Sequence, residues 1–154
     1  MTATGAKATI RPTLSAVEVD AAMELRKRVF CDEQGVSLDS ERDGRDGRDA
    51  LHLVAEADGR IVGTCRMIVA GRTATLSRMA IERAERGTGI GRRLLRAAHL
   101  HARGQSARRV VLHAQMHALG FYEAEGYAPR GPIFMEEGIE HVAMEKRLSS
   151  KAPG

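Results

Sequence analysis

A glycine-rich segment in the middle of the chain is the strongest sign of chemistry in this sequence. Residues 86–93 read Arg-Gly-Thr-Gly-Ile-Gly-Arg-Arg and stand between an expected strand ending at Ile81 and an expected helix. Glycines at a helix start let a ligand approach the backbone, and the first turn offers unpaired N–H groups at the positive end of the helix dipole. Arg92 and Arg93 are cations near this positive end, which is unfavourable for the helix unless an anion lies nearby. The segment therefore indicates a phosphate or pyrophosphate site, with solvated surface arginines as the alternative.

The glycine spacing argues against the two commonest nucleotide-binding loops. A Walker loop needs GxxxxGK[ST], and this chain has no Gly-Lys followed by Ser or Thr. A dinucleotide fingerprint needs GxGxxG, whereas here the glycines occupy positions 87, 89 and 91 and Arg92 follows. A GxGxG turn is a weak signal by itself, so its meaning depends on the segments around it.

Two segments taken together resemble the GNAT superfamily of acetyl-CoA-dependent N-acetyltransferases. Residues 77–81 (Ser-Arg-Met-Ala-Ile) followed by residues 86–91 resemble the strand, loop and helix that bind pyrophosphate in that family. Residues 115–127 resemble its second signature, in which an amide residue, an alanine, an aromatic pair and a closing glycine recur. The amide residue is more often Asn in the family and is Gln115 here, which can still donate and accept a hydrogen bond.

Flanking segments resemble one branch of the superfamily, the ElaA-like acetyltransferases. They are residues 28–30 (Arg-Val-Phe), 33–36 (Glu-Gln-Gly-Val) and 134–141 (Phe-Met-Glu-Glu-Gly-Ile-Glu-His). The branch implies an architecture and does not identify an amine acceptor.

The resemblance implies that CoA is held mainly by the backbone. Met79 and Ile81 would pair with the pantetheine arm like an added strand, and a main-chain N–H near Met79 would polarise the thioester carbonyl. The N–H groups of residues 86–91 would hold the pyrophosphate. The implied cofactor-binding residues are Met79, Ala80, Ile81, Arg86, Gly87, Thr88, Gly89, Ile90, Gly91, Arg92 and Gln115.

Tyr122 is the catalytic residue that the resemblance implies, as the general acid that protonates the departing CoA thiolate. A tyrosine hydroxyl titrates near 10 when unperturbed, so it keeps its proton at neutral pH. The alternative is that Tyr122 forms, with Phe121, an aromatic pair that only packs its helix.

The general base that takes the proton of the amine is left open. Candidates by residue type are Glu33, His52, His113, His117, Glu137 and His141, and a chain of waters would also serve. His113 and His117 have the spacing of a helical metal pair, but His113 is expected to end a strand. We therefore expect no metal.

Hydrophobic periodicity predicts the elements that position these residues. Leu51, Leu53, Ala55 and Ala57 occupy every second position of a segment that ends at the hairpin dipeptide Asp58-Gly59. Residues 60–69 and 73–81 follow as further strands of an antiparallel meander. Apolar residues then recur at helical spacing from Ile90 until Gly104. Additional strands are expected at residues 8–10, 110–113 and 141–147, and a second amphipathic helix at 116–125.

A helix is also expected before the meander, at residues 16–30, because Ser15 and Glu18 form a capping-box pattern. Its buried face should carry Val17, Ala21, Leu25 and Val29. Together these elements predict an α/β fold of the α+β kind, with a mixed, largely antiparallel central sheet flanked by helices.

Two segments are expected to lie outside the packed elements. Residues 38–49 are charged and broken by glycines, which predicts a solvated loop or a lid that faces the substrate. Residues 148–154 are expected to form a flexible tail of the single domain, residues 1–154.

The composition of the chain limits the classes of protein to which it can belong. The chain has 154 residues, of which 43% are hydrophobic and 29% charged, and no apolar run is long enough for a membrane span. The first residues lack the apolar stretch of a secretory signal, so we expect a cytoplasmic protein without membrane partners. Cys31 and Cys65 belong to no metal-binding or redox pattern and are interpreted as small hydrophobic residues.

The net charge of +4 suits an anionic ligand. A nucleic-acid ligand is disfavoured, since three Phe, two Tyr and no Trp cannot build a stacking platform. The sequence thus predicts an N-acetyltransferase in which a primary amine, on a small molecule or a peptide, attacks acetyl-CoA directly. A noncatalytic acyl-CoA-binding regulatory module is the alternative, and assembly as a homodimer is left open.

Overall fold

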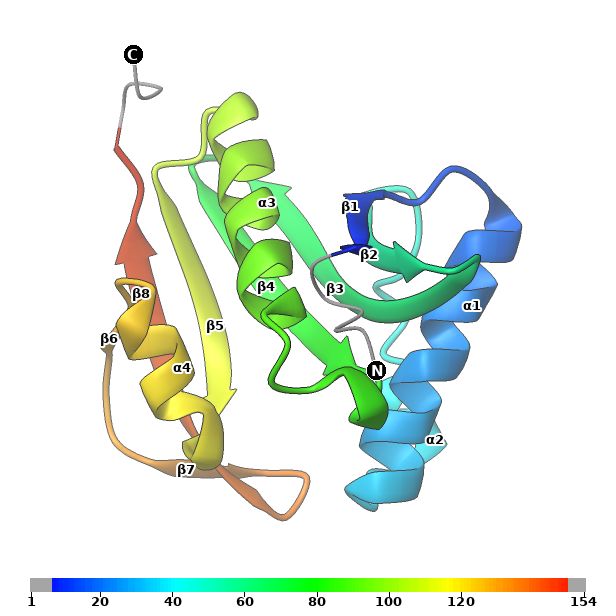
Figure 1. The fold of residues 1–154 in the computed structure, drawn as a ribbon. Helices are drawn as coiled ribbons and strands as arrows, with labels where there is room; N and C mark the ends of the chain where they lie inside the picture. Colours follow the sequence, from blue (N-terminus) through cyan, green and yellow to red (C-terminus); the bar gives the residue numbers. More distant parts are fainter. Residues whose placement is uncertain (1–6, 150–154) are drawn as a thin grey trace.

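The computed structural model describes residues 7–149, which form one mixed sheet with helices on both faces (Figure 1). The strands are β1 (Thr9–Pro12), β2 (Ala50–Ala57), β3 (Arg60–Ala70), β4 (Thr73–Ile81), β5 (Arg109–Gln115), β6 (Ala128–Pro129), β7 (Phe134–Glu136) and β8 (Ile139–Arg147). Their order is β1-β2-β3-β4-β5-β8-β6, with β7 paired to β8. In this part of the chain β4 and β5 run parallel and the other pairs antiparallel. The predicted fold class is confirmed.

The helices lie before, between and after these strands. They are α1 (Ala16–Arg26), which continues as a π-helical segment (Lys27–Glu33), α2 (Leu38–Glu41), α3 (Ile90–Gly104) and α4 (Leu119–Ala124), with 3₁₀ turns at Arg83–Glu85 and Met116–Ala118. Among residues 7–149, none of the helices has both the length and the apolar character that a membrane span requires.

The antiparallel meander follows the predicted pattern. Asp58 and Gly59 both have positive φ, of 52° and 76°, as the tight turn between β2 and β3 requires. The strand predicted at residues 73–81 has those bounds in the structure. Local turn chemistry and alternation are therefore enough to build the centre of the sheet.

Helix α3 packs on one face of the sheet, and its start is held close to β3. Ile90, Leu94 and Leu95 are buried in the main core. A Cβ on Gly63 of β3 would lie 2.9 Å from Cγ2 of Ile90, so glycine at this position permits the close approach of the helix. The N-terminus of α3 is thereby fixed beside the end of β4.

Helix α1 covers the opposite face and differs from the prediction. Leu25 and Val29 pack on Ala80 as expected, but Val17 is 76% exposed, so its assignment to the buried face was wrong. Arg26 is buried instead, because its guanidinium is fully engaged by carboxylates. Wider π-helical turns replace the last part of the predicted α-helix.

Two segments that we expected outside the packed elements are partly anchored to them. Residues 38–49 begin with α2 and are mostly exposed, as the prediction of a solvated loop requires, but ion pairs of Glu41 and Asp43 anchor the segment to α1, β3 and β4. Leu148, expected in the flexible tail, is buried, and its N–H donates to the carbonyl of Arg108. The rest of the predicted tail, from residue 150, lies outside the described residues.

Strands β4 and β5 separate after a short parallel contact. Their register covers only Thr73–Thr75 of β4 and Arg109–Val111 of β5. Beyond these residues the strands diverge, as Figure 1 shows, while each remains paired to its other neighbour. The divergence opens the sheet where the glycine-rich turn, α4 and the β7–β8 hairpin meet.

Candidate active site

A cleft of about 1280 Å³ lies where β4 and β5 separate. Its lining includes Leu112 and Tyr122, which belong to the core beneath α3. It also includes Val111 and His113, which alternate with those core residues along β5 and therefore lie on the opposite face of the sheet. The cleft therefore reaches both faces of the sheet.

A β-bulge shapes the β4 wall of the cleft. Arg78 and Met79 lie opposite the single residue Cys65 of β3, because the register moves from Thr64–Ala80 to Arg66–Ser77. Arg78 has a positive φ of 56°, a conformation that costs about 1–3 kcal/mol in a non-glycine residue. The bulge turns the strand at Met79, the residue expected beside the thioester.

Arg78 is held in this conformation by acidic partners from the α2 segment. Its Nε lies 2.8 Å from the carboxylate of Glu41, and one Nη lies 3.1 Å from that of Asp43. The same nitrogen donates to the carbonyl groups of Ser40 and Glu41. Contacts from outside the strand therefore stabilise the bulge.

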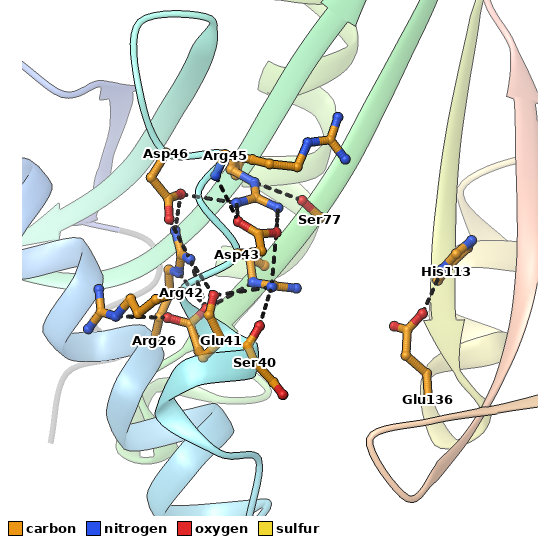
Figure 2. A network of polar contacts seen from close by, with 12 residues as sticks. Arg26, Ser40, Glu41, Arg42, Asp43, Arg45, Asp46, Ser77, His113 and Glu136 are labelled. Carbon is orange, nitrogen blue, oxygen red and sulfur yellow. Dashed lines mark hydrogen bonds and ion pairs between the residues drawn. The ribbon is translucent and has the colours of Figure 1, made fainter.

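These contacts belong to a network of charges that we refer to as the arginine network (Figure 2). It comprises Arg26, Glu41, Asp43, Asp46, Arg66 and Arg78. The side chains of Arg26 and Glu41 are each only 1% exposed. Hydrogen bonding by Arg66 lowers the pKa of Asp43, so that carboxylate is ionised at neutral pH. The network joins α1, α2, β3 and β4 at the wall of the cleft.

The glycine-rich turn presents its backbone to the cleft. Gly87 and Gly89 have φ values of 80° and 89°, and apart from each glycine and its two chain neighbours no atom lies within 4 Å of where a Cβ would stand on either. Gly89 is the residue before the first turn of α3. A ligand can therefore reach the main chain and the N–H groups at the start of this 15-residue helix.

Arg86 is engaged within the protein. Its N–H donates to the carbonyl of Arg83, its Nε donates to the carbonyl of Ile81, and an Nη forms an ion pair of 2.8 Å with Glu33. Arg92, by contrast, is 60% exposed and lies 3.7 Å from a carboxylate oxygen of Glu125. Cofactor contacts by Arg86 and Arg92 stay predictions.

The structure brings most of the predicted cofactor-binding residues to the cleft. Ala80 and Thr88 are the exceptions: Ala80 packs against α1, and the hydroxyl of Thr88 donates to the carbonyl of Glu85. The predicted residues that line the cleft are Met79, Ile81, Arg86, Gly87, Gly89, Ile90, Gly91, Arg92 and Gln115.

Gln115 bridges to the segment that follows α1. Its Nε2 donates to Oε1 of Gln34 over 2.8 Å, and Nε2 of Gln34 donates back over 3.3 Å. The two amides thus tie the end of β5 to the end of the π-helical segment. If Gln115 binds CoA, it does so either while hydrogen-bonded to Gln34 or by giving up these hydrogen bonds for contacts with CoA.

Tyr122 lies in α4 with its ring packed into the aromatic cluster of the core. The ring contacts those of Phe121 and Tyr127 edge to face, at centroid distances of 5.0 and 5.6 Å. Burial raises the pKa of its hydroxyl, so this group keeps its proton at neutral pH. Tyr122 also lines the cleft, so packing and proton donation are compatible roles for it.

The candidates for the general base are distributed unequally. His113, His117, Glu137 and His141 line the cleft. Glu33 and His52 are not among its lining residues: Glu33 pairs with Arg86, and His52 is buried beside the carbonyl of Asp46. Sequence reasoning missed Glu136, which lies 3.0 Å from Nδ1 of His113 (Figure 2).

The cysteines behave as predicted for small hydrophobic residues. Both are free thiols, and burial raises the pKa of each, that of Cys65 to about 12. A raised pKa disfavours the thiolate, which agrees with the interpretation of both as small hydrophobic residues. Within residues 7–149 there is no group of three or more His, Cys, Asp or Glu side chains placed to hold a metal ion.

Comparison with known proteins identifies the family. The family model described as an acetyltransferase (GNAT) domain matches residues 11–148. The chain belongs to the GNAT acetyltransferase family. A relative from Bacillus subtilis (strain 168), whose name classes it with the acetyltransferases, is 34% identical over 143 residues, which cover 92% of this chain and 97% of that protein. This GNAT domain is an N-acetyltransferase.

Solved structures agree with this assignment. Escherichia coli ElaA is 26% identical over 140 residues, covering 88% of this GNAT domain and 91% of ElaA. Its crystal structure superposes with a TM-score of 0.81 over 90% of this chain and 99% of that one. An aminoglycoside 6'-N-acetyltransferase complexed with coenzyme A has a TM-score of 0.77 over 94% and 99% of the two chains, and at 16% identity it shows the shared fold.

Proposed function

We propose that the protein transfers the acetyl group of acetyl-CoA to a primary amine by direct attack of the amine on the thioester. The observation that carries this proposal is the cleft between β4 and β5, which has the open glycine turn beside the start of α3 and the bulge in its β4 wall. A solved neighbour of the same fold is a complex with coenzyme A.

The glycine turn fits the pyrophosphate of CoA. Open space at Gly87 and Gly89 admits a ligand to the main chain, and the N-terminus of α3 stabilises negative charge. Larger side chains at these two positions would be strained because both φ values are positive. The pyrophosphate site would continue along the first turn of α3 to Arg92.

The diverging strands fit the pantetheine arm and the thioester. Beyond Thr75 the cleft edge of β4 is not paired with β5, so an extended arm can lie along Met79 and Ile81 as an added strand. The bulge reorients the main chain at Met79, where an N–H would polarise the thioester carbonyl.

Tyr122 supplies the remaining chemistry. Tyr122 lines the cleft, and its hydroxyl, whose pKa is raised by burial, would give a proton to the CoA sulfur as the carbon–sulfur bond breaks. The acceptor would enter from the face of β5 that carries His113, opposite α3 and α4. A cytoplasmic location, a homodimer and the class of amine stay predictions from the sequence.

A screen of amine acceptors tests this function. The protein is incubated with acetyl-CoA and polyamines, amino acids, aminoglycosides or peptides, while release of the CoA thiol and the mass of the products are followed. We expect acetylation of at least one amine. Binding of acetyl-CoA without turnover of any amine would favour a noncatalytic CoA-binding module. Salt-sensitive binding of nucleic acid without any CoA binding would contradict both.

A further inference from the structure

His113 and Glu136 form a polar pair on the acceptor face of the cleft. His113 lies on β5 opposite Ala143 of β8, on the side of the sheet away from the core residues Leu112 and Ala114. Its side chain is 55% exposed, and Nδ1 lies 3.0 Å from Oε1 of Glu136 on β7. Figure 2 shows this pair across the cleft from the arginine network. An amine that enters from this face can reach the imidazole.

The neighbours of His113 fix its orientation. The ring of Phe134 meets it edge to face at a centroid distance of 4.9 Å. The ring of Phe134 also stacks on that of His141, whose Nε2 is 3.7 Å from the second carboxylate oxygen of Glu136. Glu136 on β7 and His141 on β8 are thus titratable groups beside His113, and Glu137, Glu145, His117, Arg109 and Arg130 line the same cleft.

Hydrogen-bond chemistry determines which nitrogen of His113 is available. An ionised carboxylate only accepts hydrogen bonds, so Nδ1 of His113 carries the hydrogen that it shares with Glu136. In the neutral imidazole Nε2 then holds the free electron pair. By the same reasoning Nδ1 of His141 donates to the carbonyl of Ile139, but that ring is buried. Of the two rings, His113 is the one exposed to an acceptor.

We propose that His113 is the general base of the acetyl transfer and that Glu136 is its positioning residue. This inference rests on the proposed function. Nε2 of His113 takes one proton from the ammonium form of the acceptor. The freed nitrogen electron pair forms the C–N bond with the thioester carbonyl carbon. The C–S electron pair leaves with sulfur, which takes the Tyr122 proton, and the second nitrogen proton restores Tyr122 through water.

The test compares two amines of different basicity. Putrescine is a primary alkylamine that is an ammonium ion at neutral pH, whereas hydroxylamine is largely neutral there and does not need a base. Wild-type protein, His113→Gln, Glu136→Gln and the control His101→Gln are assayed for acetyl-CoA affinity, kcat and KM over a range of pH. His101 lies on α3, away from the residues that line the cleft.

His113→Gln should lower kcat/KM for putrescine by about 100-fold or more at neutral pH. It should leave acetyl-CoA affinity and the hydroxylamine rate within about threefold of wild type. Because the variant needs an amine that is already neutral, its deficit with putrescine should shrink as pH rises. Glu136→Gln should show the same preference for hydroxylamine with a smaller loss, since the amide still accepts from Nδ1. His101→Gln should match wild type.

An equal loss with both amines, or a deficit with putrescine that does not change with pH, would assign His113 a structural role and overturn the inference. If His113→Gln does not fold, Glu136→Gln decides by its ratio of putrescine to hydroxylamine rates. If wild-type protein acetylates neither amine, the same pH comparison is made with the alkylamine acceptor found in the screen; acetylation of no amine at all overturns the proposed function and with it this inference. Acetylation of both amines without a change in the variants overturns the role of His113 alone.

Discussion

Replacing Glu41 by Gln tests how strongly charge holds the α2 segment against the cleft. The Glu41 carboxylate lies 2.8 Å from Arg26 and 2.8 Å from Arg78, and its side chain is 1% exposed. The substitution keeps the shape of the side chain and removes its charge. It therefore isolates the electrostatic contribution of one residue at the centre of the arginine network.

The expected loss in the free energy of unfolding depends on the acidic partners that Arg26 and Arg78 keep in the variant. Removing one partner of a buried ion pair costs about 3–5 kcal/mol, because the other charge stays buried without compensation. Arg26 keeps Asp46 at 2.7 Å and Arg78 keeps Asp43 at 3.1 Å, so we expect the low end, about 3 kcal/mol. For a chain of this size each kcal/mol lowers the melting temperature by about 2–4 °C. The variant should therefore melt roughly 6–12 °C below wild type.

Urea and thermal unfolding followed by circular dichroism measure this change. Asp39→Asn is the matched control, since it removes a carboxylate from the same helix at an exposed position. It should change the free energy of unfolding by about 0.5 kcal/mol or less. A Glu41→Gln protein within about 1 kcal/mol of wild type would show that the network contributes little, and would refute this explanation for the order of residues 38–49.

Two further outcomes are expected. Gly89→Glu should abolish CoA binding, measured by calorimetry. Gly59→Glu is the control, because Gly59 in the β2–β3 turn also has a positive φ and open surroundings, and this variant should bind CoA normally. Equal affinities in folded proteins would contradict the pyrophosphate site. Acid should destabilise the protein, because hydrogen bonding by Arg11 lowers the pKa of Glu18 to about 2 and Arg66 lowers that of Asp43. These contributions are fully present above the unfolded pKa values near 4 and are lost as pH falls through the lower folded values, so unfolding free energies measured from pH 5 to 2 should decline. A flat profile would contradict the pairing.

The sequence predicted those helices, strands and turns that are determined by residues within the same short segment. Asp58-Gly59 specifies its turn by backbone conformation, and the apolar spacing from Ile90 specifies α3. The glycine-rich turn was predictable for the same reason, because its backbone conformation, with positive φ at Gly87 and Gly89, depends on the glycines themselves. By contrast, β6 and β7 comprise two and three residues, too few to show a period. Their pairing with β8 depends on the surrounding fold.

Charged residues account for most of what the sequence could not show. Residues 38–49 are mostly exposed, as their composition predicts, but the sequence does not show that Glu41 and Asp43 are anchored, because their partners Arg26, Arg66 and Arg78 come from three other elements. The bulge at Arg78 is likewise held by contacts with Glu41 and Asp43, which are distant in sequence. The sequence did contain one signal for these ion pairs: several acidic residues in one segment, and arginines at positions predicted to lie in a helix and in strands. This signal does not say which acidic residue pairs with which arginine.

The contact of His113 with Glu136 is nonlocal in the same way. The sequence placed His113 among several candidates without a criterion to choose between them. Pairing of β7 with β8 and of β8 with β5 brings Glu136 to its imidazole. Only the assembled sheet distinguishes this histidine from the others.

Tyr122→Phe tests most directly whether this cleft catalyses the acetyl transfer. The substitution keeps the ring that packs against Phe121 and Tyr127 and removes only the hydroxyl. Acetyl-CoA affinity and the single-turnover rate are measured for both proteins with the best acceptor from the screen. We predict nearly unchanged affinity and a rate lower by roughly 10²–10⁴, the usual contribution of a positioned general acid. A variant that keeps more than about half of the wild-type rate would contradict proton donation by Tyr122 and leave it as a packing residue.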